Sequence, residues 1–199
     1  MKKHYLFTLI FSLLFSFTYA QTTYYVMKST DPIAAQSSAI SPSDSNNGTS
    51  ILTPKETLSG AITAAAANGQ NGDTIIVGPG EFSDSQLTVS ENLTIQGAGR
   101  ELTIFKRTGG SAAGFMSIQG DVTLKDMTIR DYNVSIGGGA LHIGAGWGYA
   151  TTTNTYTVNI ENILFVNNYS GWNGGAIGTA QVLNTTAYTR VNIDECLFY

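Results

Sequence analysis

Three stretches of the chain can be laid over one another, and they decide the fold. They read Val122-Thr-Leu-Lys-Asp-Met-Thr-Ile129, Val158-Asn-Ile-Glu-Asn-Ile-Leu-Phe165 and Val191-Asn-Ile-Asp-Glu-Cys-Leu-Phe198. The second begins 36 residues after the first and the third 33 residues after the second, and a looser copy with one extra residue spans 87–95. Self-similarity at such a period is typical of a solenoid or a repeat array, in which neighbouring units bury one another's apolar faces.

Apolar and polar residues alternate within each copy, which predicts a β-strand. Because stacked strands lie roughly 4.8 Å apart, like side chains would pile on like. The expected inward columns are Val122/Val158/Val191, Leu124/Ile160/Ile193, Met127/Ile163/Cys196 and Ile129/Phe165/Phe198. Cys196 therefore falls among aliphatic neighbours, and we interpret it as a small core residue rather than a reactive thiol.

A second motif, Gly-Gly-Ala followed by Leu or Ile, keeps the step of 36 residues. Its residues are Gly138, Gly139 and Ala140 in one copy and Gly174, Gly175 and Ala176 in the next. We expect the paired glycines to form tight corners with positive φ, and Asn167 and Asn168 to form an amide ladder inside a turn. No helical pattern separates the strand-like runs after Asp73, so a β-solenoid is favoured over leucine-rich or helical repeats. A propeller would need four strands in units of about 40–45 residues, which these shorter units fit less well.

Residues 1–20 have the pattern of a secretory signal peptide. Lys2 and Lys3 precede an apolar run over 6–17, and Ala20 ends a short stretch suited to cleavage before Gln21. An N-terminal membrane anchor is the alternative, but twelve residues of helix span about 18 Å, less than the roughly 30 Å of a hydrocarbon core. We therefore expect the protein to be exported.

A short strand and a polar loop are expected over 21–52, and a helix over 53–69. Thr53 is a suitable N-cap, Pro54 suits the first helical position, and Glu56 fits a capping box. An apolar stripe follows at helical spacing, formed by Leu58, Ala61, Ile62 and Ala65, and Asn68-Gly69 predicts the stop. We interpret this helix as a cap over the first rung of the repeats, which would occupy 70–199.

The composition excludes several classes of protein. Only 12% of residues are charged and the net charge is −4, so nucleic-acid binding has no electrostatic basis. Cys196 is the single cysteine, which excludes a disulfide scaffold, and two histidines are too few for a multi-histidine zinc site. An apolar content of 42% is too high for a disordered chain.

Two features resemble known families. Asp44-Ser-Asn-Asn-Gly48, Thr53-Pro54 and Gly72-Asp-Thr-Ile-Ile-Val-Gly-Pro-Gly-Glu-Phe82 look like the start of secreted right-handed parallel β-helix proteins of pectate-lyase-like architecture. Gly174-Gly-Ala-Ile177 with Phe165-Val-Asn-Asn168 resembles the GGA[ILV]/FxxN repeat of chlamydial-type polymorphic outer-membrane proteins. The repeat at Ile129-Arg-Asp-Tyr132 departs from it by lacking FxxN.

These resemblances imply an all-β, right-handed parallel β-helix at a bacterial outer-membrane surface or outside the cell. The sequence ends inside a strand motif at Tyr199, and we expect it to be a fragment of a longer reading frame; a short natural protein with a ragged end is the alternative. The resemblance implies that further rungs and an outer-membrane barrel or a sorting tail would follow, and contact with the outer membrane would come only through that part.

Candidate residues for chemistry are few. Glu161, Asp194 and Glu195 crowd like charges that a Ca²⁺ ion could bridge, although a solvated surface explains them too, and no cofactor is expected otherwise. Polysaccharide lyases of similar fold use acidic Ca²⁺ ligands with a nearby Arg or Lys, and the nearest match is Arg130 with Asp126 and Asp131. We expect His142 to be solvated beside Gly139.

Aromatic residues gather in the expected loops beside the glycine corners. Trp147, Tyr149, Tyr169 and Trp172 could stack on sugar rings, and loop packing is the alternative. Two functions remain open. The first is a non-enzymatic exported surface protein whose β-helix stalk adheres to a glycan, a host or a neighbouring cell. The second is a polysaccharide lyase or glycoside hydrolase with its groove beyond residue 199. Low charge favours the first.

Overall fold

Parallel β-sheets make up most of the computed structural model, which describes residues 21–36, 39–109, 112–135, 137–144, 155–179 and 188–199. The expected signal peptide, residues 1–20, lies outside the described residues. Every pairing between the named strands of the described residues is parallel. The all-β class expected from the repeats is therefore confirmed, with helices confined to 32–35 and 58–68 among the described residues.

The strands form three sheets. The main path of the nine-stranded sheet runs through β1 (Thr23–Val26), β2 (Asp73–Val77), β5 (Leu93–Gly97), β8 (Val122–Arg130), β11 (Tyr156–Val166) and β14 (Thr189–Asp194). Attached to it are β3 (Gly80–Phe82), β6 (Thr103–Lys106) and β15 (Leu197–Phe198). The four-stranded sheet contains β4 (Leu87–Val89), β7 (Met116–Ile118), β10 (Leu141–Ile143) and β13 (Ile177–Thr179). The two-stranded sheet pairs β9 (Asn133–Val134) with β12 (Tyr169–Ser170).

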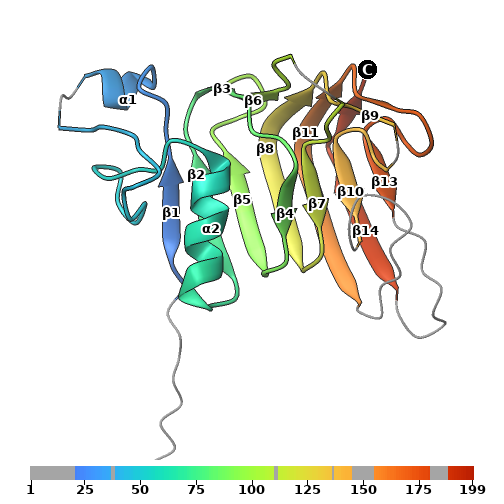
Figure 1. Ribbon diagram of the computed structural model, residues 1–199, viewed down its shortest axis with the longest axis horizontal. Coiled ribbons are helices and arrows are strands. Elements are labelled where there is room, and N and C mark those ends of the chain that lie inside the picture. The colour runs from blue at the N-terminus through green and yellow to red at the C-terminus, as the bar shows by residue number, and fades with distance from the viewer. Residues whose placement is uncertain (1–20, 37–38, 110–111, 136, 145–154, 180–187) are drawn as a thin grey trace, which may run out of the picture.

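The chain alternates between these sheets, so neighbours in a sheet are distant in sequence. From β7 it enters the nine-stranded sheet at β8, passes through β9 to β10, and returns to the nine-stranded sheet at β11 (Figure 1). Val158 pairs with Val122 on one side and Val191 on the other, as the overlay predicts. The inward columns are thus confirmed as register partners, except at Cys196, which lies between the paired residues of β14 and β15.

The prediction that 87–95 is a further copy of the repeat is wrong. Leu93 stands opposite Val122 and Ile95 opposite Leu124, whereas Leu87 pairs with Met116 in the four-stranded sheet. Leu87-Thr-Val89 and Leu93-Thr-Ile95 have the same apolar–polar–apolar pattern. The pattern alone therefore does not decide which of the two stretches pairs with the repeat at 122–129. The pairing partners decide it, because the chain passes from the four-stranded sheet to the nine-stranded sheet over 90–92.

A contiguous apolar core lies between the sheets. The eight inward positions of β8 and β11 are at most 1% exposed. An aromatic stack runs along the core, in which the ring centroids of Phe82 and Phe105 lie 5.3 Å apart, those of Phe105 and Phe115 4.7 Å, and those of Phe115 and Tyr132 5.4 Å. Such pairs add roughly 0.5–1.5 kcal/mol each beyond the burial of apolar area.

The columns change environment at β14 and β15, where Ile193 and Phe198 are each 50% exposed. Phe198 still stacks on Phe165 at 5.1 Å between centroids. Cys196 is half-buried against the core rather than enclosed in it. The inward orientation expected for this third copy is therefore only partly matched by burial.

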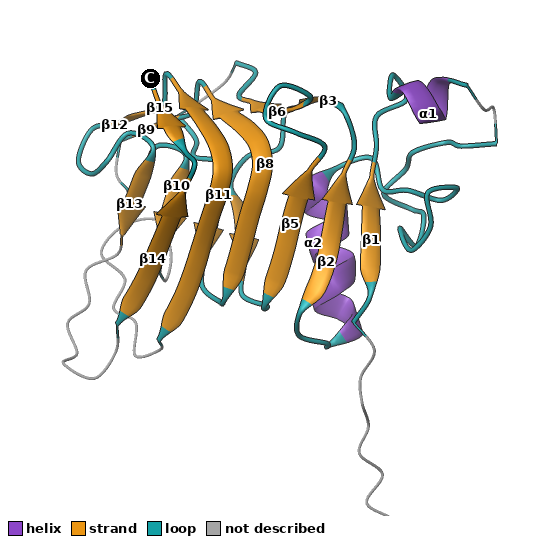
Figure 2. Cartoon of the chain, turned by 180° about the vertical axis from the view of Figure 1, so that it is seen from behind, coloured by secondary structure: helices purple, strands orange, loops and turns teal. Residues whose placement is uncertain are grey.

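Helix α2 (Leu58–Asn68) packs against β1 and β2, on the same side of the nine-stranded sheet as the four-stranded sheet (Figures 1 and 2). The predicted stripe Leu58, Ala61, Ile62 and Ala65 is buried, and Gly69 ends the helix at φ 67°. None of the helices among the described residues combines the length and the hydropathy that a membrane span requires.

The expected start of this helix is wrong by four residues. Thr57, not Thr53, is the N-cap, and its hydroxyl accepts a hydrogen bond from the Gly60 amide at 2.9 Å. Asp44 explains the shift, since its carboxylate accepts from the amides of Glu56 and Thr57, both at 3.0 Å, and holds the chain extended there. A second, four-residue helix, α1 (Pro32–Ala35), was not expected.

Candidate functional site

Side-chain ladders occupy the bends where the lyase-like residues were sought. We call a rung the stretch of chain from one strand on the main path of the nine-stranded sheet to the next. Asp126, Asn162 and Glu195 stand in successive rungs, each with φ between 50° and 61°. The side chains of Gln96 and Asn162 donate to the two carboxylate oxygens of Asp126, at 3.1 and 2.8 Å. Asn and Asp tolerate this left-handed conformation better than most residues. At this bend, Asp126 is hydrogen-bonded to a side chain from the rung on each side.

Arg130 and Asp131 belong to a second ladder. The guanidinium Nε of Arg130 lies 2.8 Å from Asp131 Oδ2, and the Asn167 amide donates to Asp131 Oδ1 at 2.9 Å. Burial raises the pKa of Asp131, but the bonds from Asn167 and Arg130 outweigh it and hold that pKa below its ordinary value. The structure thus joins Arg130 to Asp131, whereas Asp126 binds partners at the other bend.

Asn167 and Asn168, predicted to form an amide ladder, do bond across rungs, but to a carboxylate and to the backbone rather than to other side-chain amides. Besides the bond from Asn167 to Asp131, Asn168 accepts from the Tyr132 amide at 3.1 Å and donates to the Ile129 carbonyl at 2.8 Å. Asn168 thereby links two rungs beside the buried Phe165. In the FxxN motif, Phe165 therefore packs in the core and Asn168 bonds to the backbone of the neighbouring rung.

The glycines of the Gly-Gly-Ala motif are required for a different reason from the one expected. None of Gly138, Gly139, Gly174 and Gly175 is among the glycines with positive φ. Instead, a Cβ on Gly139 would collide with the backbone carbonyls of Gly175 and Tyr169. Close approach of one backbone to the next, rather than a left-handed corner, excludes a side chain.

His142 is buried, contrary to expectation. All three residues of β10 are buried, so the polar–apolar alternation that placed His142 outside does not apply there. Its Nδ1 accepts from the Gly138 amide at 3.4 Å, and burial lowers its pKa. The imidazole is therefore a neutral part of the packing next to the Gly-Gly-Ala motif.

The residues suggested for Ca²⁺ lie on neighbouring strands at the last rungs. Glu161 is the register partner of Asp194, and Glu195 follows at the left-handed bend. Within the described residues, no three acidic, histidine or cysteine side chains gather in a group that could hold a metal ion. The adjacent Cys196 thiol donates to the Asp194 carbonyl at 3.2 Å, and burial raises its pKa.

Two of the four aromatic candidates can be placed. Trp147 and Tyr149 lie outside the described residues. Tyr169, the first residue of β12, is 59% exposed, and Trp172, on the segment that leads from β12 to β13, is 63% exposed. Backbone bonds fix this segment on the rung below, with the Tyr169 amide donating to Tyr132 at 2.8 Å and the Gly171 amide to Val134 at 3.0 Å. The aromatic side chains thus project from an ordered segment.

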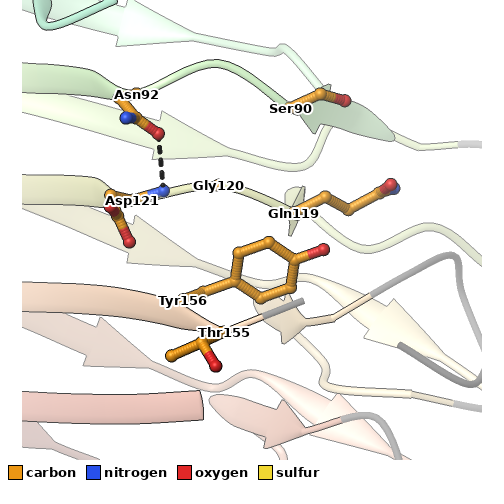
Figure 3. A pocket seen from close by; sticks show the side chains of 7 residues that line it. All are labelled: Ser90, Asn92, Gln119, Gly120, Asp121, Thr155 and Tyr156. Carbon is orange, nitrogen blue, oxygen red and sulfur yellow. Dashed lines mark hydrogen bonds between the residues drawn. The ribbon is translucent and has the colours of Figure 1, made fainter. Parts of the chain in front are cut away.

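Sequence reasoning missed a polar hollow of about 470 Å³ at the opposite ends of the strands. Two stacked turns, β4–β5 and β7–β8, form it together with the start of β11 (Figure 3). Its lining residues are Ser90, Asn92, Gln119, Gly120, Asp121, Thr155 and Tyr156. These residues come from three different rungs, and the repeat pattern of the strands carries no signal of a hollow between turns.

Comparison of the chain with protein-family models, with curated proteins and with solved structures finds no match.

Proposed function

We propose that this protein is an exported, non-enzymatic surface protein whose right-handed parallel β-helix serves as a stalk for adhesion to an extracellular glycan or a cell surface. The parallel pairing of every named strand, the alternation of the chain between sheets and the ladders of Asp126 and Asp131 support such a coil. The resemblance of the Gly-Gly-Ala and FxxN motifs to polymorphic outer-membrane proteins is in keeping with a surface location.

The exposed pair Tyr169 and Trp172 carries the proposal. Both side chains are more than half exposed, and aromatic faces stack well on the C–H faces of sugars. The hydrogen bonds of the β12–β13 segment to the rung below hold the backbone in place, which reduces the entropy lost on binding.

The residues nearest to a lyase set have structural roles that agree with a non-enzymatic stalk. Asp131 uses its two oxygens for Asn167 and Arg130, and Asp126 uses its two for Gln96 and Asn162. A carboxylate bound in this way is poorly placed to bind Ca²⁺ or to receive a proton. These bonds favour adhesion over a polysaccharide lyase, the alternative.

The test is a binding assay on the purified protein with bacterial cells and with insoluble cellulose, chitin and mannan as surfaces. We expect retention on at least one surface and a loss of about tenfold or more in the double variant Tyr169→Ala, Trp172→Ala, in line with the weight of aromatic contacts in interfaces. Tyr188→Ala is the matched control, because Tyr188 is 57% exposed but lies before β14, away from the β12–β13 segment.

Two outcomes would contradict the proposal. Unchanged retention of the double variant would mean that Tyr169 and Trp172 are not the contact. Release of unsaturated product from a polyuronate, lost on addition of EDTA, would mean that the protein is a lyase.

A further inference from the structure

The hollow between the β4–β5 and β7–β8 turns is held open by fixed side chains. The Asn92 Oδ1 accepts from the Asp121 amide at 3.1 Å, and the Asp121 Oδ1 accepts from the Thr157 amide at 2.7 Å. Each side chain thereby bridges to the following rung, and its remaining polar atom has a set direction. The walls of the hollow are preorganised, which lowers the cost of binding.

Gly120 keeps the two turns close and leaves the hollow clear. A Cβ on Gly120 would lie 2.9 Å from the Ser90 carbonyl oxygen and 2.8 Å from that of Glu91. Any larger residue would push the turns apart. Figure 3 shows the Tyr156 ring next to this point, between the backbone of Gly120 and Thr155.

The polar groups on the walls suit hydroxyl groups. After the bonds above, Asn92 retains its amide donor Nδ2, and Asp121 retains its acceptor Oδ2. A hydroxyl both donates and accepts, so neighbouring hydroxyls on one sugar ring can satisfy a donor and an acceptor at the same time. Tyr156 is 7% exposed and forms part of the wall, so the polar side chains of Asn92 and Asp121 provide the contacts to a ligand.

Charge and space narrow the class of ligand further. Among the described residues that line the hollow, Asp121 is the only charged one, and it would repel an anionic ligand. A second hollow of about 250 Å³ shares Asn92 and Asp121 and continues onto the nine-stranded sheet beside Thr94, Thr123 and Asn159. The two hollows therefore adjoin at Asn92 and Asp121.

We propose that these two hollows bind an uncharged oligosaccharide, with Asn92 and Asp121 as its central hydrogen-bonding pair. This site goes beyond the proposed adhesion through Tyr169 and Trp172, which lie at the other ends of the strands.

Isothermal titration calorimetry of the purified protein tests the proposal. The probes are cellohexaose, mannohexaose and xylohexaose, with hexagalacturonate as the charged comparison. We expect at least one uncharged probe to bind at concentrations below about 10 mM and hexagalacturonate to bind less tightly. Asp121→Asn keeps the bond to Thr157 but turns the free acceptor into a donor, and we expect it to weaken binding by about tenfold or more.

Matched variants separate the hollow from other effects. Glu81→Gln removes the same charge from an exposed position on β3 and should bind as the unchanged protein does. The double exchange Asn92→Asp, Asp121→Asn restores one donor and one acceptor and should recover part of the affinity. Gln119→Ala, whose side chain supports no ladder bond, replaces Asp121→Asn if that variant fails to fold.

The outcomes also distinguish the two proposed sites. Loss of binding in Asp121→Asn but not in Trp172→Ala supports the hollow, whatever the result of the adhesion assay. Loss in Trp172→Ala alone, unchanged binding in Asp121→Asn, hexagalacturonate binding as tightly as the uncharged probes, or no binding of any uncharged probe would each overturn it.

Discussion

Gly139 has no room for a methyl group, and this distinguishes it from the glycine that ends α2. We expect Gly139→Ala to cost about 1–3 kcal/mol of unfolding free energy or more, because the backbones of two rungs must separate. Gly69→Ala meets nothing within 4 Å, and its cost of about 1 kcal/mol comes only from its left-handed φ of 67°. Urea denaturation of both variants checks this. Equal costs would contradict close approach as the reason for the motif.

Asp131 makes stability depend on pH. Its pKa in the folded protein is lowered, so its ionised form stabilises the fold above the unfolded pKa of roughly 3.9, and that contribution is lost as the pH falls through the folded pKa. Asp131→Asn should therefore lower the Tm at pH 6 and have a diminishing effect below about pH 4. A difference in Tm that stays the same across this range would contradict the assignment.

His142 also makes the protein less stable as the pH falls, but at a higher pH than Asp131 does. Burial lowers its folded pKa, so the neutral imidazole is preferred, and stability falls as the pH drops below the unfolded pKa of roughly 6.5. We expect the His142 ring resonances in an NMR titration to give a pKa below that value. A pKa at or above 6.5 would mean that the imidazole is solvated, as the sequence alone suggested.

At the scale of the element, α2 shows how a competing side chain moves a helix boundary. Thr53-Pro54 with Glu56 satisfies the local rules for a start, and no local rule includes Asp44, twelve residues before Glu56. The buried stripe and the Gly69 stop were predictable because helical period and glycine geometry are local. The first residue of the helix was not predictable, because the contact with Asp44 holds Glu56 and Thr57 outside the helix.

The N-cap provides a direct test. Thr57→Ala should cost about 1 kcal/mol of unfolding free energy, because the hydroxyl accepts from the Gly60 amide and donates to Asp44 Oδ2 at 2.7 Å. Thr53→Ala should cost less, since its exposed hydroxyl bonds only to Asn47. The comparison requires equilibrium unfolding of both variants, and a larger effect at Thr53 would place the cap where the sequence pattern does.

Short strands were harder to predict than long ones. The strands β9, β10, β12 and β13 have two or three residues each, too few for an alternation to be recognised. They are visible only through their pairing partners in the next rung. The hollow beside Asn92 and Asp121 could not be predicted for the same reason, because the turns that form it come together only when the strands pair.

At the scale of the molecule, the stack should unfold unevenly. The inward positions of β8 and β11 are covered on both sides by neighbouring rungs, while Ile193 and Phe198 of the last strands are half exposed. In hydrogen–deuterium exchange we expect amides of β8 and β11 to be protected far longer than those of β14, by about a hundredfold or more. Uniform protection from β1 to β14 would instead indicate a single cooperative unit.

The aromatic stack is the second molecular-scale test, because it links successive rungs through the core. Phe105→Ala removes the ring that contacts both Phe82 and Phe115, and we expect a cost of about 3–5 kcal/mol. Phe198→Ala, at a half-exposed ring with one stacked neighbour, should cost much less. Thermal unfolding of the two variants checks the difference, and similar values would contradict a core that runs through Phe105.

Register and chain length are independent in this protein. Thr94 pairs with Thr123, 29 residues later, Thr123 with Asn159 after 36, and Asn159 with Asn192 after 33. The spacing between paired residues differs from rung to rung because the connections between the sheets differ in length. Deleting one residue inside β8 would invert its alternation, whereas turns can gain or lose residues without moving a single partner. A foreign peptide could therefore be inserted in a turn while the rungs on either side keep their alignment, which makes the chain a natural scaffold for display.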